Sequence, residues 1–304
     1  MKALVTGSSG LIGARICHLL LSRGWEVNGV DIKHIPQEGV NHFQCNILDA
    51  DGLKKAMKGC DVVFHEAAAS SSPMFYPDPR EGFHVNVDGS LTVFQAAHEL
   101  GVGKVVAAST SSIYGNSELP SREGGLFVAP NMYASSKQAM EDAGLTFSEV
   151  TGMPVVFLRY FSVYGLGERR KGPIANMLSQ FIWDALELDG SGRRPVIYGD
   201  GKQTRDLVFA DDIAMANLLA AQKSIPPDVY NVGTGKETSL NEMLRVIGRV
   251  TGKELEGSYI KNPISNYIYR TLADTSKTQK TIGFTASTDV ESGVRAIVAE
   301  LSGS

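Results

Sequence analysis

The stretch Thr6-Gly-Ser-Ser-Gly-Leu-Ile-Gly13 lies between an apolar strand pattern at 2–5 and a helical pattern at 11–23. Its three glycines permit a tight turn and a close approach of the backbone to a pyrophosphate, whose charge a helix N-terminus stabilises. A lone glycine triplet is a weak signal, but between a strand and a helix it indicates a dinucleotide-binding loop. The alternative is a strand–helix turn that binds no ligand.

Strand and helix patterns alternate around this loop, which is typical of an α/β fold. The expected strands are 2–5, 26–30, 42–45, 61–65, 104–108, 155–160 and 229–232, and the expected helices are 11–23, 53–58, 85–100, 131–150, 211–221 and 239–251. We therefore expect a Rossmann-type, doubly wound parallel sheet with a smaller C-terminal substrate lobe.

The pattern loosens after about residue 165, which suggests two lobes. The segments 168–172 and 189–195 are rich in charge and glycine and are expected to be surface loops. The expected division is an NAD-binding domain at 1–165, completed by about 206–235, and a substrate-binding lobe at 166–205 and 236–304.

Composition excludes several classes of protein. The chain has 304 residues, of which 43% are hydrophobic and 20% charged, and its net charge is −4 without a basic run. Nucleic acid and anionic membrane surfaces are therefore not expected partners. The three cysteines, Cys17, Cys45 and Cys60, lack metal-ligand spacing, so we expect no metal site but buried, reduced thiols in a cytoplasmic protein.

Asp31 ends the second expected strand, 18 residues after Gly13. A carboxylate at this position accepts hydrogen bonds from both hydroxyls of a ribose and repels a 2′-phosphate. The sequence therefore predicts NAD rather than NADP as the cofactor.

The segment Tyr133-Ala-Ser-Ser-Lys137 places a phenol and an ammonium group four residues apart, on one face of an expected helix. A phenol normally titrates near ~10, and an adjacent ammonium favours its ionised form. Tyr-x-x-x-Lys is frequent by chance. Behind a nucleotide-binding loop, it indicates an acid/base pair that serves a nicotinamide.

Together these motifs resemble the extended short-chain dehydrogenase/reductase family, in its nucleotide-sugar epimerase/dehydratase branch. The glycine spacing Gly-x-x-Gly-x-x-Gly is similar to that of the family. A further segment, Asn46-Ile-Leu-Asp49, is similar except that Asn46 replaces the usual Asp. The other similar positions are His65-Glu-Ala-Ala-Ala69, Asn86, Ser-Thr-Ser-Ser-Ile-Tyr-Gly at 109–115, and the segments 158–165, 198–206 and 231–235.

The resemblance implies roles for individual residues. Tyr133 would be the catalytic base, Lys137 would lower the pKa of its phenol and hold the nicotinamide ribose, and Thr110 would bind the reacting sugar hydroxyl. The implied cofactor contacts are Gly7, Gly10, Leu11, Ile12, Gly13, Asp31, Asn46, Ile47, Ala67, Asn86, Ser109, Tyr133, Lys137 and Tyr160. The implied substrate contacts are Thr110, Ser111, Tyr133, Ser162, Asn176, Arg205, Arg270 and Thr271.

Several of these residues have a plainer interpretation. Arg205 would grip the nucleotide diphosphate, which suits a guanidinium fork, or it is a solvated loop arginine. Thr110 is alternatively a strand-end cap, and Tyr114 either contacts substrate or closes the pocket wall. His65 is expected to be a packed strand-end residue rather than a proton carrier.

The two residues after Thr110 predict the reaction. By resemblance, 4,6-dehydratases and UDP-glucuronate decarboxylases carry a carboxylate between this threonine and the Tyr-Gly pair, whereas this chain has Ser111 and Ser112. A serine does not readily protonate a leaving hydroxyl at neutral pH. Reversible hydride transfer at C4 remains, which predicts a 4-epimerase with a UDP-hexose of the glucose/galactose type as substrate.

Two departures from the family concern the substrate. Ser162 replaces an expected Asn, and 262–272 lacks the family's Arg-x-Gly-Asp segment, for which Arg270 is a candidate replacement. In a gapless reading back from Ala273-Asp274, the position that gates the C2 substituent of the sugar falls at Thr271. A threonine there leaves room for an N-acetyl group.

Other functions stay open at this point: a nucleotide-sugar 4-reductase, dehydrogenase or dehydratase, or a non-catalytic NAD-sensing module. The Tyr133/Lys137 pair argues against the last of these. The resemblance also implies a homodimer.

Overall fold

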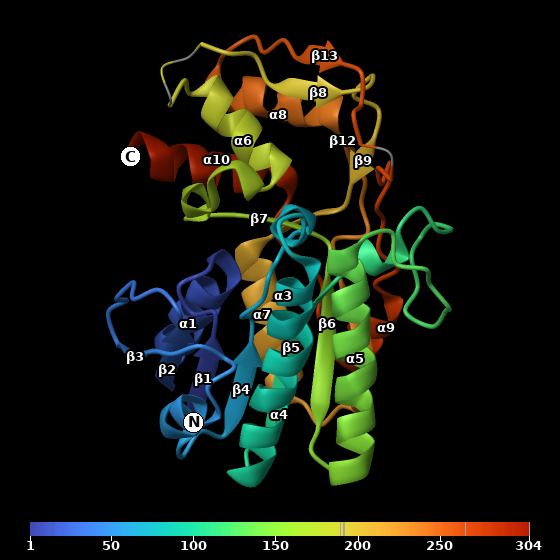
Figure 1. Cartoon of the computed structure of the whole chain (residues 1–304). Coiled ribbons are helices and arrows are strands. Elements are labelled where there is room, and N and C mark those ends of the chain that lie inside the picture. Colours follow the sequence, from blue (N-terminus) through green and yellow to red (C-terminus); the bar gives the residue numbers. More distant parts are fainter. Residues whose placement is uncertain (189, 191, 265, 304) are drawn as a thin grey trace.

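The computed structural model describes residues 1–188, 190, 192–264 and 266–303. A seven-stranded sheet lies at its centre, and every neighbouring pair of its strands is parallel (Figure 1). In spatial order the strands are β11 (Val229–Val232), β6 (Val155–Tyr160), β5 (Lys104–Thr110), β4 (Val62–His65), β1 (Lys2–Thr6), β2 (Glu26–Asp31) and β3 (Val40–Gln44). The predicted doubly wound sheet is confirmed.

The order of the strands reverses between β1 and β4. The chain runs from β1 outward to β2 and β3, then crosses back to β4 and continues to β5 and β6. Loops that follow β1 and β4 therefore diverge at the carboxyl edge of the sheet. In such sheets the crevice at the reversal point is the usual place for a ligand.

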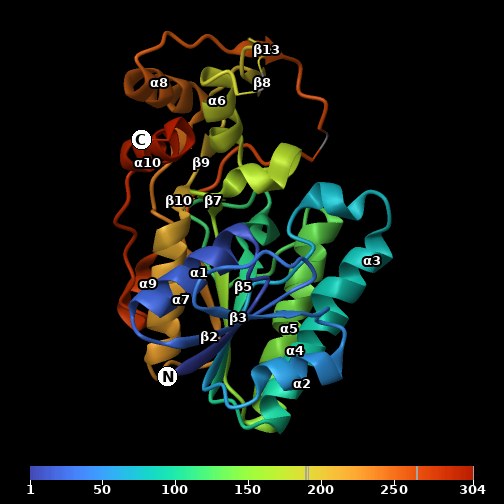
Figure 2. The ribbon, with the colours of Figure 1, turned by 90° about the vertical axis from the view of Figure 1, so that its left-hand side faces the viewer.

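Helices cover both faces of the sheet (Figure 2). One face packs against α1 (Leu11–Ser22) and α7 (Ala210–Gln222), and the other against α2 (Ala50–Met57), α4 (Gly89–Glu99) and α5 (Met132–Thr151). Side chains alternate accordingly, as in β1, where Ala3 and Val5 join the first core and Leu4 joins the second. Because both faces are covered, a central strand such as β4 is buried throughout, whereas the edge strand β3 is partly exposed.

A smaller lobe lies above the carboxyl edge of the sheet (Figure 1). Its core is formed by α6 (Met177–Ala185), α8 (Leu240–Thr251) and α10 (Val290–Ser302). The hydroxyl of Ser239 caps α8 by accepting the Glu242 amide. The expected domain boundaries at 165, 206 and 235 stay a prediction.

Short elements connect the two lobes and flank the sheet. Six short strands form three pairs: β7 (Ser162–Tyr164) with β10 (Leu207–Phe209), β8 (Val196–Tyr198) with β13 (Ser258–Ile260), and β9 (Thr204–Arg205) with β12 (Thr238–Ser239). The short helices are α3 (Pro79–Phe83) and α9 (Ser276–Thr281). The helical turns are η1 (Ser72–Phe75), η2 (His84–Asp88), η3 (Ser111–Tyr114) and η4 (Glu168–Ile174). Among the described residues, no helix is both long and apolar enough to span a bilayer.

The structure corrects three local expectations. Residues 168–172 belong to the helical turn η4 and not to a surface loop, because the buried Glu168 carboxylate accepts the Ser179 hydroxyl and the Asn176 amide. The expected helix at 85–100 begins with the π-helical turn η2, in which Asn86 is buried against the Ala69 backbone. Cys45 is only half-buried, since it lies at the edge of a cleft, whereas Cys17 and Cys60 are buried.

Of the expected loop at 189–195, residues 189 and 191 lie outside the described part of the chain.

Candidate active site

A cleft of about 910 Å³ opens at the reversal point of the sheet. We call it the main cleft. One wall is the glycine loop with the ends of β2 and β4, and the opposite wall comes from 163–174 and Glu300. It contains these predicted cofactor contacts: Gly7, Gly10, Leu11, Ile12, Gly13, Asp31, Asn46, Ile47 and Ala67.

The backbone of the glycine loop leaves no room for a side chain at Gly7 or Gly13. Gly7 has φ +66°, and a Cβ on it would lie 2.7 Å from the Ala67 nitrogen. A Cβ on Gly13 would lie 2.2 Å from the Gly7 carbonyl oxygen. The first helical turn of α1 receives no side-chain cap from Gly10, so its amides are free to bind an anion in the cleft. These residues fit a dinucleotide pyrophosphate.

Asp31 is held at the edge of the main cleft by the backbone. Its Oδ2 accepts the Ser9 amide at 3.0 Å, and its Oδ1 accepts the Lys33 amide at 2.9 Å. A carboxylate has about four acceptor sites, so each oxygen keeps capacity for a ribose hydroxyl. The position fits the predicted preference for NAD.

Helix α5 positions the expected catalytic pair. The helix begins after Asn131, whose side chain accepts the Ala134 amide at 2.9 Å. Tyr133, in its first turn, lies beside Thr110 at the end of β5, and this threonine acts to lower the pKa of the Tyr133 phenol. Thr110 also accepts the Ser112 amide at 3.1 Å, so it caps η3 as well. The structure therefore brings Thr110 and Tyr133 together from distant parts of the chain.

Lys137 lies one turn further along α5, and its ammonium donates to the Ala108 carbonyl at 2.9 Å. Burial lowers its pKa to about 8, against the opposing effect of Glu66 and Glu141. The expected effect of Lys137 on the pKa of Tyr133 stays a prediction. Burial raises the pKa of that phenol, and Thr110 acts in the opposite direction.

Sequence reasoning missed a buried ion pair beneath this site. Arg159 donates to both oxygens of Glu141, at 2.9 and 2.6 Å, and both side chains are buried. Ser109, a predicted cofactor contact, instead donates its hydroxyl to Glu141. The signal was available, because Tyr133, Lys137 and Glu141 follow one another at intervals of four on one helix face.

Three further polar residues support the site from within. The amide of Asn86 binds the Ala69 backbone and the Ser136 hydroxyl. Tyr160 donates its hydroxyl to Glu66 at 2.8 Å. His65 bonds the hydroxyls of Thr6 and Ser90, and burial lowers its pKa to about 3, which confirms it as a packed, neutral residue.

Tyr114 closes the wall of the site and does not face substrate. It is buried, its hydroxyl donates to Asn231 Oδ1 at 2.6 Å, and its ring lies beneath the Arg159 guanidinium, 4.9 Å from the ring centroid. Of the two interpretations of Tyr114, substrate contact or closure of the pocket wall, the structure supports closure of the wall.

The predicted substrate contacts fall into separate groups. Thr110 and Tyr133 meet at the carboxyl edge of the sheet, and Ser111 starts η3 beside them. Ser162 begins β7, and Asn176 caps α6 while its amide donates to the Val163 carbonyl at 3.0 Å.

The remaining candidates, Arg205, Arg270 and Thr271, form a third group around Asp206. Arg205 donates to the Thr204 and Tyr269 carbonyls. Arg270 makes a bidentate ion pair with Glu237 at 2.9 and 2.6 Å, and the Thr271 hydroxyl accepts the Asp206 amide at 3.0 Å. Each already has a protein partner.

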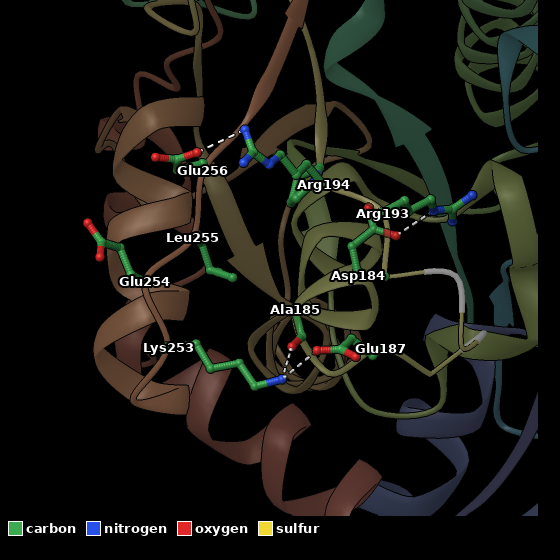
Figure 3. A pocket seen from close by; sticks show the side chains of 11 residues that line it. Asp184, Ala185, Glu187, Arg193, Arg194, Lys253, Glu254, Leu255 and Glu256 are labelled. Atoms are coloured by element: carbon green, nitrogen blue, oxygen red, sulfur yellow. Dashed lines mark hydrogen bonds and ion pairs between the residues drawn. The ribbon is translucent and has the colours of Figure 1, made fainter.

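A second pocket, of about 330 Å³, lies in the smaller lobe between α6 and 253–256 (Figure 3). Its cations already have protein partners: Arg194 pairs with Glu256, Arg193 with Asp184, and Lys253 with Glu187 and the Ala185 carbonyl. Among the described residues, no cluster of His, Cys, Asp and Glu is arranged to hold a metal ion.

Comparison of sequences gives one family and several relatives. The sequence model of the NAD dependent epimerase/dehydratase family matches residues 3–233. A UDP-glucuronate 4-epimerase of Thermodesulfobacterium geofontis is 29% identical over 315 residues, which cover 97% of this chain and 94% of that protein. A UDP-N-acetyl-alpha-D-glucosaminuronate decarboxylase of Bacillus cytotoxicus is 31% identical over 264 residues, which cover 82% and 80%.

Solved structures are similar over nearly the whole chain. A UDP-N-acetylglucosamine 4-epimerase of Methanobrevibacter ruminantium, in complex with UDP-N-acetylmuramic acid, has a TM-score of 0.92 and 31% identity, covering 99% of this chain and 98% of that one. A UDP-glucose 4-epimerase of Thermus thermophilus, in complex with NAD, has a TM-score of 0.89 and 29% identity, covering 100% of both chains.

Proposed function

We propose, from the premise that the chain belongs to the NAD dependent epimerase/dehydratase family, that it is an NAD-dependent 4-epimerase of UDP-hexoses. Membership of this family confirms the resemblance predicted from the motifs. The observation that carries the proposal is that Tyr133, in the first turn of α5, lies beside Thr110, at the carboxyl end of β5, and that this threonine lowers the pKa of the phenol against the effect of burial. This arrangement supplies a proton acceptor beside a cleft that fits a dinucleotide.

In this reaction Tyr133 takes the proton of the C4 hydroxyl and later returns it. The Thr110 hydroxyl hydrogen-bonds the same C4 oxygen and holds it in place. Bound NAD supplies the hydride acceptor and, in its oxidised form, a positive charge that opposes the raised pKa of the phenol. Lys137 would hold the nicotinamide ribose. To do so, its ammonium must either give up its hydrogen bond to the Ala108 carbonyl or donate a second hydrogen bond beside it.

Epimerisation is favoured over elimination because Ser111 and Ser112 follow Thr110. Of the two carboxyl groups that act on the pKa of Lys137, Glu141 is committed to Arg159, and Glu66 accepts the Tyr160 hydroxyl and lines the main cleft. A decarboxylase among the relatives makes decarboxylation the principal alternative, and it is tested in the same assay.

The choice of UDP-hexose is tested with a panel of UDP-, dTDP-, GDP- and CDP-sugars, including UDP-glucose, UDP-N-acetylglucosamine and UDP-glucuronate, with products identified by NMR. We expect C4 inversion of UDP-glucose without release of NADH. A pentose product from UDP-glucuronate alone would replace the proposal with decarboxylation. Stoichiometric NADH without an epimer would replace it with a dehydrogenase.

The preference for NAD over NADP is proposed from Asp31, whose carboxylate lies where a 2′-phosphate would be repelled. Nucleotide extracted from the purified protein and identified by mass should be NAD. Recovery of mainly NADP would contradict this choice.

The homodimer and the cytoplasmic location stay predictions. Three unpaired thiols among the described residues suit a reducing compartment. Light scattering on the purified protein should give twice the monomer mass, and a monomeric mass would overturn the dimer.

A further inference from the structure

Glu66 follows β4 directly and lies at the point where the strand order reverses. Its backbone touches the glycine loop, since a Cβ placed on Gly7 would lie 2.9 Å from the Glu66 carbonyl carbon. Its side chain lines the main cleft together with that loop. Any anion bound to the loop is therefore a close neighbour of this carboxyl.

The side chain of Glu66 is oriented by a chain of hydrogen bonds that crosses the sheet edge. Asn217 of α7 donates to the Tyr160 hydroxyl at 2.8 Å, and this hydroxyl donates to Glu66 Oε1 at 2.8 Å. Among the described residues, no protein donor reaches Oε2. One oxygen is thus fixed and the other is available to a ligand in the main cleft.

We propose that Glu66 is an additional ligand of the dinucleotide, which it binds as a neutral carboxylic acid that donates its Oε2 proton. An ionised Glu66 beside a pyrophosphate is a repulsive pair, whereas a neutral acid is a hydrogen-bond donor. The inference rests on the proposed NAD dependence. It assigns Tyr160, a predicted cofactor contact, the role of a positioning residue for Glu66.

The surroundings of Glu66 support this protonation state. Burial raises its pKa to about 7, and the Tyr160 hydroxyl and the Lys137 ammonium act in the opposite direction. The other charged or titratable side chains of the main cleft are Arg15 and His18 of α1, Asp31, Lys33, Glu38, Cys45, Glu81, Arg170 and Lys171 of η4, and Glu300.

Two of these cations are partly neutralised within the protein. Arg15 pairs with Asp211, and Lys171 pairs with Glu168. Neither bond involves Glu66, so they leave its second oxygen to the ligand.

The proposal makes NAD affinity depend on pH in one direction. Below pH 7 Glu66 is already neutral, and binding takes up no proton. Above pH 7 the protein must bind a proton together with NAD, so the affinity falls by up to about tenfold per pH unit. Glu66→Gln replaces the acid by a permanently neutral donor. The ratio of dissociation constants, wild type over Glu66→Gln, should therefore be near 1 at pH 6 and about 10 at pH 8.

The test is a calorimetric titration of NAD into protein freed of bound nucleotide, at pH 6, 7 and 8. Glu81→Gln is a matched control, because it removes an exposed carboxylate of the same cleft. His18→Asn is a second control, because it removes the imidazole that lines the same cleft. Both controls should keep the pH dependence of the wild type.

Equal pH dependence of the wild type and Glu66→Gln would overturn the proposal. If Glu66→Gln does not fold, the proposal is tested on the wild type alone. The number of protons taken up on NAD binding is then measured calorimetrically at pH 8 in two buffers of different ionisation enthalpy. Uptake approaching one proton supports the proposal, and none overturns it. NAD binding without pH dependence refutes only the role of Glu66, whereas no NAD binding at any pH refutes the proposed function itself.

Discussion

The two halves of the candidate site differ in what their groups already bind. In the cofactor half (Gly7–Gly13, Asp31, Thr110, Tyr133 and Lys137), the glycine loop and Asp31 line the main cleft, and the other three lie at the end of β5 and in the first turns of α5. In the substrate half (Ser162, Asn176, Arg205, Arg270 and Thr271), the polar groups of the last four are bound to other protein groups. In the cofactor half only Lys137 must exchange or share a bond in its proposed role, whereas in the other half four of the five candidates must do so.

The largest difference in turnover is expected between two tyrosine variants. Tyr133→Phe removes the proton acceptor of the cofactor half and should lower kcat by about 10²–10⁴ while NAD is retained. Tyr114→Phe is the matched control, because its hydroxyl bonds Asn231 and not substrate. It should cost about 1 kcal/mol of stability and little activity. Steady-state kinetics and nucleotide content measure both effects, and near-normal turnover of Tyr133→Phe would remove it as the base.

A second contrast concerns ion pairs in the two halves. Glu141→Gln leaves the buried Arg159 without its counter-charge and should lower the free energy of unfolding by about 3–5 kcal/mol. Glu237→Gln breaks the pair with Arg270, whose side chain is 57% exposed, and should have a much smaller effect. Urea denaturation of both variants gives the comparison. Equal losses would contradict the view that the buried pair is the more costly one to break.

The same contrast explains what sequence could and could not predict. The glycine loop, Asp31 and the Tyr133/Lys137 pair lie at strand ends or at helical spacing, so local patterns place them correctly. The bonds of Arg270 to Glu237 and of Asn176 to Val163 depend on lobe packing, which no local pattern encodes. Glu168 was misjudged for this reason, because a charged residue in a glycine-containing segment has no local signal of burial.

A third prediction concerns the stability of the cofactor half. Lys137 is buried with its pKa lowered from 10.5 to about 8, so folding disfavours its ammonium. Lys137→Met should inactivate the enzyme but raise the free energy of unfolding at pH 7 by about 2 kcal/mol, after the lost bond to Ala108 is counted. The gain should be constant below about pH 8, shrink as pH rises and become a small loss by pH 10.5, where only the lost bond to Ala108 remains.

Denaturation across this pH range measures the effect, with the surface variant Lys54→Met as control. A pH-independent difference between Lys137→Met and the wild type would show that the ammonium is not the cause.

The smallest effect is expected in the substrate half. Thr271→Tyr should lower kcat/KM for UDP-N-acetylhexosamine about tenfold more than for UDP-hexose, because the ring overlaps the acetyl group. Thr271 also accepts the Asp206 amide, so Thr271→Val, which loses the hydroxyl at nearly constant size, is the control. The gate is refuted if the wild type turns over only unacetylated sugar, or if Thr271→Tyr lowers both activities equally.

The central claim is that hydride leaves C4 and returns to C4 of the same sugar within one turnover. UDP-glucose deuterated at C4 tests it directly, with the product isolated and examined by NMR and mass spectrometry. The account predicts UDP-galactose that retains the deuterium at C4, without added cofactor. Loss of the label to solvent, its accumulation in released NADH, or a product unchanged at C4 would contradict the account.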